Sequence, residues 1–150
     1  MSRESPVGPI YSGAYKRSMD AKNRVTIPSD WLTGDEPRFF AIPDSKQEFL
    51  VVMPPEEFDQ IEGRIQASSA SPQEKRAATR QFYSDAHAVT TDKQGRMLLP
   101  DEHCKRTELS GEVVIVGSRS RFEIWNSARW NEATGKQVPV YQKIADLIGL

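Results

Sequence analysis

The chain has 150 residues, enough to bury about 68 to 70% of its unfolded surface as one domain or two small intertwined halves. Its net charge of −1 argues against a generally basic nucleic-acid binder, so binding to DNA would need basic groups gathered on one face of an assembly. One cysteine cannot close an intrachain disulfide, and the longest apolar runs are strand-sized. We therefore expect a cytoplasmic protein without a membrane segment.

The chain opens with residues 1–10, whose prolines and glycine predict a flexible lead. Alternating apolar and polar side chains from Tyr15 to Met19 then predict a half-buried strand. A nine-residue pattern follows at residues 20–28 and returns at residues 92–100, an offset of 72 residues. Each copy places an Asp four residues before an Arg and a Pro four residues after it, with apolar residues at alternate positions between them. This spacing indicates a duplicated unit.

Each copy of the pattern predicts a tight turn that leads into a strand. Asn23 and Gly95 occupy the same position, and these two residue types accept a positive φ most readily. Asp20 and Asp92 stand at the first turn position, where a carboxylate can accept hydrogen bonds from backbone N–H groups a few residues on. A strand-turn-strand hairpin is the simplest interpretation, and these four residues are expected to orient its turn.

The two arginines of the pattern, Arg24 and Arg96, have two interpretations. Each guanidinium can pair with the Asp of its own copy and lock the turn, or the two turns can display both guanidinium groups on one face. Residues 11–28 carry four basic side chains and one acidic one, and this local excess favours display toward nucleic acid. The residues expected to contact DNA are Arg24, Arg96, Lys22, Lys93, Lys16 and Arg17.

The remainder of the first half predicts strands and helices. The expected elements are a short helical turn at 29–32 that ends in 33–37, strands at 38–42 and 48–52, and a helix from Pro54 with Phe58, Ile61 and Ile65 on its packing face. Ser71 is expected to cap a further helix with an inner stripe of Ala78, Phe82 and Ala86. The opposite face of that helix, with Lys75, Arg76 and Arg80, suits either a solvated surface or a contact to phosphate.

The second half predicts the same order of elements. Strands at 112–117 and 121–125 correspond to the two strands of the first half. Residues 127–134 are expected to form a closing helix with Trp130 as a core anchor. Residues 137–150 are expected to form a last helix, whose apolar stripe suits packing on a neighbouring subunit.

Several of these segments together resemble the MraZ family of bacterial transcriptional regulators. The resemblance is carried by residues 20–28 and 92–100, the lead-in Tyr11–Tyr15, the strand Val113–Gly117 and the run Phe122–Trp125. One departure is visible, because Asn23 stands where the family usually has Gly.

The resemblance implies a fold and a function. The implied fold is mainly β with helices packed around it: a swapped-hairpin (double-split) β-barrel of two pseudo-twofold repeats, related to AbrB-type DNA-binding domains. The halves would be residues 11–70 and residues 71–150, the second including the linking helix and the C-terminal helix. The implied function is sequence-specific binding of double-stranded DNA by a closed homo-oligomeric ring. Its targets would be repeated promoter elements of the cell-division and cell-wall gene cluster, including its own gene, in the nucleoid.

The sequence predicts no enzyme, cofactor or metal site. His87, His103 and Cys104 stand without the motifs of metal or nucleophile chemistry, so we expect structural roles for them. A carboxylate-dependent hydrolase built on Asp20 and Asp92 is a distant alternative, since the turn position explains both residues. A nearer alternative is a ring-forming scaffold or antitoxin-like protein that binds a protein partner without DNA. Salt dependence separates DNA binding from this alternative.

Overall fold

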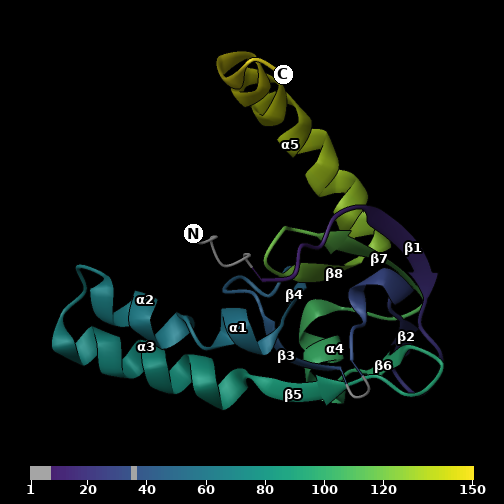
Figure 1. The fold of residues 1–150 in the computed structure, drawn as a ribbon, viewed down its shortest axis with the longest axis horizontal. Helices are drawn as coiled ribbons and strands as arrows, with labels where there is room; N and C mark the ends of the chain where they lie inside the picture. The colour runs from purple at the N-terminus through teal and green to yellow at the C-terminus, as the bar shows by residue number, and fades with distance from the viewer. Residues whose placement is uncertain (1–7, 35–36) are drawn as a thin grey trace, which may run out of the picture.

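The computed structural model describes residues 8–34 and 37–150. Most of the expected lead, residues 1–7, and residues 35–36 at the end of the expected helical turn lie outside the described residues. The chain is built mainly from antiparallel strands with several helices, as the sequence predicts (Figure 1).

Strands and helices alternate along the chain in two similar series. The strands are β1 (Ala14–Ser18), β2 (Arg24–Thr26), β3 (Arg38–Pro43), β4 (Leu50–Met53), β5 (His87–Thr90), β6 (Arg96–Leu98), β7 (Glu112–Gly117) and β8 (Phe122–Asn126). The helices are the 3₁₀ helix η1 (Ser29–Trp31), α1 (Pro55–Phe58), α2 (Ile61–Ala67), α3 (Pro72–Asp85), α4 (Asp101–Thr107) and α5 (Ser127–Ile148). The strands predicted around residues 38–42, 48–52, 112–117 and 121–125 are confirmed.

The strands form two antiparallel sheets. One has six strands in the order β1-β7-β8-β4-β3-β5, and the other is a two-stranded ribbon of β2 and β6. The pairing is the same in both halves. β1 pairs with β7 of the other half, and its counterpart β5 pairs with β3, the counterpart of β7; β4 pairs with its own counterpart β8. In the ribbon Val25 pairs with its own counterpart Met97, so the pseudo-twofold relation passes through this pair.

The simple hairpin prediction is wrong about strand partners. The turns themselves form, with Asp20 N–H donating to Arg24 O at 3.0 Å and Asp92 N–H donating to Arg96 O at 2.9 Å. Beyond each turn, however, the strand ladders join the two halves, and within the second copy a single bridge links Thr91 to Met97. The cross-half ladder places Val25 opposite Met97 and buries both side chains almost completely, which stabilises this pairing through the apolar contact.

The main core lies between the six-stranded sheet and the ribbon. Its aromatic centre is made of Tyr11, Trp31, Phe39 and Phe122, with Tyr11 packed edge-on against Trp31 and Phe122 at centroid distances of 5.3 Å. A second, smaller cluster of Ile42, Val51 and Met53 forms on the other face of β3 and β4. The sheet is therefore apolar on both faces in this region.

The helices of the first half differ in part from the prediction. The helix expected from Pro54 is divided into α1 and α2, and Phe58 at the end of α1 stacks on Phe40 at 3.9 Å. The cap at Ser71 is confirmed, because its hydroxyl accepts from Glu74 N–H at 3.1 Å while Glu74 Oε1 accepts from Ser71 N–H at 2.8 Å. α2 and α3 form a helical hairpin that extends from the sheet (Figure 1), and Ala78 of the expected inner stripe is exposed.

The helices of the second half include one that the sequence analysis does not predict, α4. Its first turn carries two acids and its last turn Lys105 and Arg106, a charge order that favours a helix. The two helices predicted within residues 127–150 are one continuous helix, α5, which passes through Pro139. Trp130 near its start is half-buried and packs edge-on against Trp125 at 5.4 Å, so it lies at the margin of the core. The rest of α5 projects away from the sheet (Figure 1).

No helix among the described residues is both long and apolar enough to span a bilayer.

Candidate nucleic-acid interface

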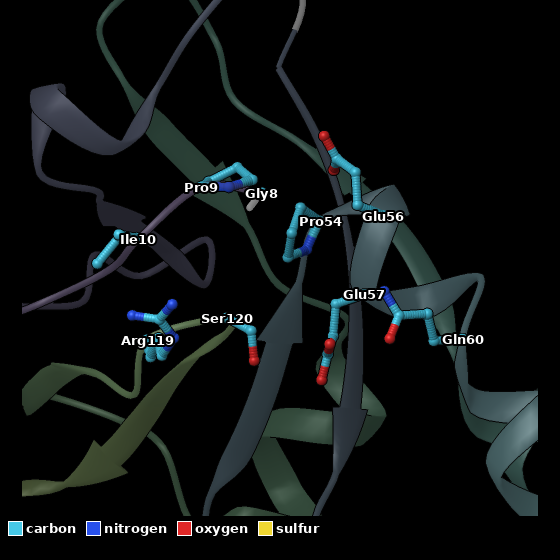
Figure 2. Close-up of a pocket in the computed structure, with 9 residues that line it drawn as sticks. All are labelled: Gly8, Pro9, Ile10, Pro54, Glu56, Glu57, Gln60, Arg119 and Ser120. Carbon is cyan, nitrogen blue, oxygen red and sulfur yellow. The ribbon is translucent and has the colours of Figure 1, made fainter. Parts of the chain in front are cut away.

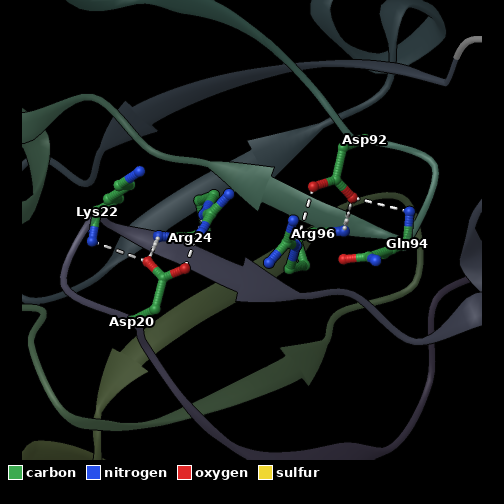
Figure 3. Close-up of polar contacts among 6 residues, drawn as sticks. All are labelled: Asp20, Lys22, Arg24, Asp92, Gln94 and Arg96. Atoms are coloured by element: carbon green, nitrogen blue, oxygen red, sulfur yellow. Dashed lines mark hydrogen bonds and ion pairs between the residues drawn. The ribbon is translucent and has the colours of Figure 1, made fainter.

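The two turns of the repeated pattern have the same hydrogen bonds. Asp20 Oδ1 accepts from the backbone N–H groups of Lys22 and Arg24, both at 2.9 Å. In the second copy Asp92 Oδ1 accepts from Gln94 N–H at 2.9 Å and from Arg96 N–H at 3.0 Å, as Figure 3 shows. Each carboxylate thereby satisfies two N–H groups that the tight turn leaves without a strand partner.

The tightest point of each turn has a positive φ. Asn23 has φ 62° and Gly95 has φ 80°, so both lie in the left-handed region that the two residue types tolerate best. Asn23 also donates from Nδ2 to Asp101 Oδ1 at 3.1 Å, a contact to the start of α4 that glycine cannot make. Asn23 therefore forms the same kind of turn as Gly95 and in addition ties it to the second half.

Each arginine of the pattern is held by its own aspartate. Arg24 Nε donates to Asp20 Oδ2 at 2.7 Å, and Arg96 Nε donates to Asp92 Oδ2 at 2.9 Å. These side chains are 30% and 34% exposed, and within residues 8–34 and 37–150 their terminal nitrogens donate no hydrogen bond. The ion pair thus fixes the side chain through Nε and leaves the two outer nitrogens of each guanidinium available.

The carboxylates stay ionised in this arrangement. The backbone N–H of Arg24, together with the guanidinium, holds the pKa of Asp20 below its usual range, and Arg96 lowers the pKa of Asp92 in the same way. Near neutral pH both acids are charged, so they accept hydrogen bonds and cannot donate a proton. Both carboxylates therefore act as hydrogen-bond acceptors that hold the turns.

The ribbon places both arginines on one exposed face. Its register sets Arg24 opposite Leu98 and Thr26 opposite Arg96, while Val25 and Met97 between them point into the core. Figure 3 shows the two arginines between the two aspartates. Thr26 and Leu98 share this outward face, and Leu98 is 58% exposed. The sequence analysis does not single them out, although each lies two residues after an arginine and so on the same side of its strand.

The other predicted basic residues divide into two groups. Lys22 and Lys93 are exposed on the two turns. Arg17 donates from Nε to Thr26 O at 3.1 Å and lies with Lys93 along a groove of about 560 Å³ beside the second turn. Lys16 is exposed on the opposite face of β1, because successive side chains of a strand alternate. The structure therefore brings five of the six predicted residues to the ribbon and turns and directs Lys16 away.

Of the three residues considered for metal or nucleophile chemistry, His103 and Cys104 are buried, and His87 is exposed on β5. His103 is almost fully buried in α4, its Nε2 lies 2.8 Å from Asp85 O, and desolvation lowers its pKa. Burial raises the pKa of Cys104 to about 11, so its thiol is protonated near neutral pH. In the part of the chain that the structure describes, no group of three or more His, Cys, Asp or Glu side chains is arranged to hold a metal ion.

A small pocket lies beside residues 8–10, at the start of α1 (Figure 2). Its volume of about 80 Å³ is below the roughly 300 to 1,000 Å³ typical of ligand sites. Glu57, which lines it, is buried and pairs with both Arg64 and Arg121. Hydrogen bonds from Arg64 and Arg121 hold the pKa of Glu57 below its usual range, so this acid stabilises the packing of α1 and α2 on the sheet.

These features define a class: a duplicated antiparallel β protein that presents two aspartate-held arginines on an exposed ribbon. Comparison with known proteins then gives the family. Residues 10–81 and residues 82–148 each match the family model described as "MraZ protein, putative antitoxin-like". The chain belongs to the MraZ family, and the resemblance stated from its sequence is confirmed.

Relatives named "Transcriptional regulator MraZ" cover nearly the whole chain. The protein of Carboxydothermus hydrogenoformans is 36% identical over 91% of this chain and 95% of its own length. The proteins of Symbiobacterium thermophilum and Heliobacterium modesticaldum are 33% and 31% identical, each over 91% of this chain and 99% and 95% of their own lengths. The family is thus one of transcriptional regulators.

Proposed function

We propose that this chain regulates transcription by binding double-stranded DNA through the outward face of the β2–β6 ribbon and its two turns. One observation carries the proposal. Arg24 and Arg96 lie on one exposed face, each held through Nε by an ionised aspartate, with both terminal nitrogens of each left for a ligand. A guanidinium fixed in this way is preorganised for a bidentate acceptor.

The acceptor that suits this arrangement is the O6 and N7 edge of guanine. The major groove of DNA is about 12 Å wide and admits a two-stranded ribbon, and bidentate contact of arginine with guanine is the commonest specific contact in that groove. Lys22, Lys93 and Arg17 lie around the ribbon and are placed to contact phosphate, which sets position and orientation. Lys16, on the far face of β1, has at most a distant electrostatic role.

The fold that displays the ribbon is proposed to be the closed, double-split barrel of the family. The strand order supports closure, because the ribbon contacts both edges of the six-stranded sheet: β1 lies against β2, and Thr91 after β5 bridges to Met97 of β6. The halves would be residues 11–70 and 71–150, each contributing four strands. Closure would remove free sheet edges and hold the ribbon rigidly.

Self-association is the second part of the proposal. One subunit offers one small basic face, and the net charge of the chain is −1, so a single copy is expected to bind DNA weakly. A homo-oligomeric ring that engages several repeats at once would bind far better, by roughly 10²- to 10⁴-fold when the spacing fits. We propose repeated promoter elements as the target, in the cell-division and cell-wall gene cluster that includes its own gene. Binding would take place in the cytoplasm, at the nucleoid.

Salt dependence tests the DNA contact. Affinity for a duplex from upstream of the gene is expected to fall log-linearly with salt, with a slope of about −0.9 for each phosphate contact. Replacing Lys22 or Lys93 by alanine should make the slope shallower by about one contact per engaged subunit. Arg76→Ala on α3 is the matched control, since Arg76 is exposed and lies outside the ribbon and its turns. Affinity that does not respond to salt would support a protein-binding scaffold and contradict the proposal.

A further inference from the structure

The outward face of the β2–β6 ribbon contains one large apolar side chain, Leu98, among polar ones. Leu98 is 58% exposed, while its neighbours Met97 and Leu99 are buried in the core. Among residues 8–34 and 37–150 it is the one large apolar side chain that is exposed on a strand. A leucine exposed to this degree adds little to the core, so the packing of the described chain does not account for it.

The two copies of the repeated pattern differ at this position. Leu98 lies six residues after Asp92, and Thr26 lies six residues after Asp20. The arginines of the two copies are equivalent, so the face is symmetrical in its guanidinium groups and unsymmetrical in the side chains beside them. Leu98 therefore distinguishes the half of the face that contains Arg24.

The register of the ribbon places Leu98 directly opposite Arg24. Residues that lie directly opposite in an antiparallel pair have Cβ atoms about 4.5 to 5.5 Å apart. Successive bases of a DNA strand are about 3.4 Å apart, so two side chains at this separation can reach adjacent base pairs. When Arg24 reads a guanine, Leu98 faces the base pair next to it.

The major groove offers a leucine one apolar group, the C5 methyl of thymine. The other groups that base pairs present there are hydrogen-bond donors and acceptors. Leucine has neither a donor nor an acceptor, so against those groups it would displace water and leave them unsatisfied. The thymine methyl is therefore the group in the groove that Leu98 fits.

We propose that Leu98 is a specificity-determining residue, whose side chain packs on the methyl group of a thymine in the base pair beside the guanine read by Arg24. This inference rests on the proposed DNA contact and adds to it a preference for thymine that no hydrogen bond supplies. Burial of one methyl group corresponds to about 4-fold in affinity for each engaged subunit.

Replacement of thymidine by deoxyuridine tests the inference, because the two nucleosides differ only in the C5 methyl. The probes are a duplex from the region upstream of the gene and the same duplex with deoxyuridine in place of thymidine. In fluorescence anisotropy the wild type is expected to bind the deoxyuridine duplex about 4-fold more weakly per engaged subunit. Leu98→Ala is expected to bind the two duplexes equally, with an unchanged Tm because the side chain is exposed.

Two control variants separate the methyl contact from other causes. Thr26→Ala changes the equivalent position of the other copy, and Lys22→Ala removes an exposed charge from the first turn. Lys22→Ala should weaken binding to both duplexes by the same factor, since phosphates are identical in the two. Both variants are expected to keep the wild-type ratio of the two affinities.

Three results would overturn the inference. Equal affinity of the wild type for the two duplexes would remove the methyl contact and leave the proposed DNA contact in place. An undiminished difference in Leu98→Ala would show that another side chain reads the methyl. Failure of the wild type to bind either duplex would overturn the proposed function and this inference with it.

Discussion

Replacing Arg24 or Arg96 by alanine is expected to weaken DNA binding and leave the fold intact. Each side chain is about one-third exposed and pairs only with its own aspartate among the described residues, whose two backbone hydrogen bonds remain after the truncation. If the outer nitrogens of each guanidinium read one guanine, the lost contact costs about 1 to 3 kcal/mol, or about 5- to 150-fold in Kd per engaged subunit. Both arginines together should cost more than either alone.

Lysine at the same positions separates the kinds of contact. Arg24→Lys keeps the positive charge and loses the planar pair of donors, so a guanine contact is still damaged and a phosphate contact is largely kept. Fluorescence anisotropy on one duplex at one salt concentration measures the affinity, and thermal melting measures the fold. Arg76→Ala, on the exposed face of α3, serves as the control and should change neither.

The opposite pattern would assign Arg24 a purely structural role. If Arg24→Ala lowers the Tm by several degrees while the affinity per folded molecule is unchanged, the arginine only locks its turn to Asp20. The contact to DNA would then have to be made elsewhere on the ribbon or its turns.

Three further predictions concern packing and protonation. Gly117→Ala should lower the Tm by several degrees, because the added Cβ would lie 2.4 Å from backbone atoms of Tyr11 and Ser12. Gly135→Ala is the control: it has open space around it on α5 and should stabilise the protein by about 0.5 to 1 kcal/mol. An equal response of the two variants would contradict the close packing at Gly117. Cys104, whose pKa burial raises to about 11, should not react with a disulfide reagent near about pH 8 until the protein is unfolded, and rapid reaction of the native protein would refute its burial. His103 has a pKa lowered by burial, so the unfolded chain takes up its proton first, near about pH 6.5, and stability should fall as the pH decreases below that value. Urea unfolding at several pH values checks this, and His103→Gln should give a shallower slope.

The sequence predicted the parts of the fold that depend on local chemistry. The positive φ at Asn23 and Gly95 and the cap at Ser71 follow from what single side chains and their near neighbours can do. The strands around residues 38–42 and 112–117 follow from their β-branched and aromatic composition. In each case the physical cause lies within a few residues.

The partners of the strands were not predictable in the same way. A two-residue period of apolar side chains shows which side of a strand is buried. It does not show which strand lies beside it. The turn after β1 allows β2 either to pair back onto β1 as a hairpin or to cross to the other half. The pairing of Val25 with Met97 shows that β2 crosses. Likewise, the sequence predicts separate helices at residues 127–134 and 137–150, whereas α5 is continuous through residues 135 and 136.

The candidate site shows the same division. Repetition identified Arg24, Arg96 and the turns that hold them. It could not separate Arg17 from Lys16, which differ only in the face of β1 on which they lie. Thr26 and Leu98 became visible as part of the surface only once β2 and β6 were seen to pair.

Footprinting on the region upstream of the gene shows whether this protein reads repeated DNA through the β2–β6 ribbon. Protection is expected at regularly spaced elements, with protected guanines in each, and it should strengthen as elements are added. The double variant Arg24→Ala and Arg96→Ala should leave the same DNA unprotected while remaining folded and assembled. Uniform or absent protection by the folded, assembled wild type, or an unchanged footprint with the double variant, would show that the ribbon does not read repeated DNA.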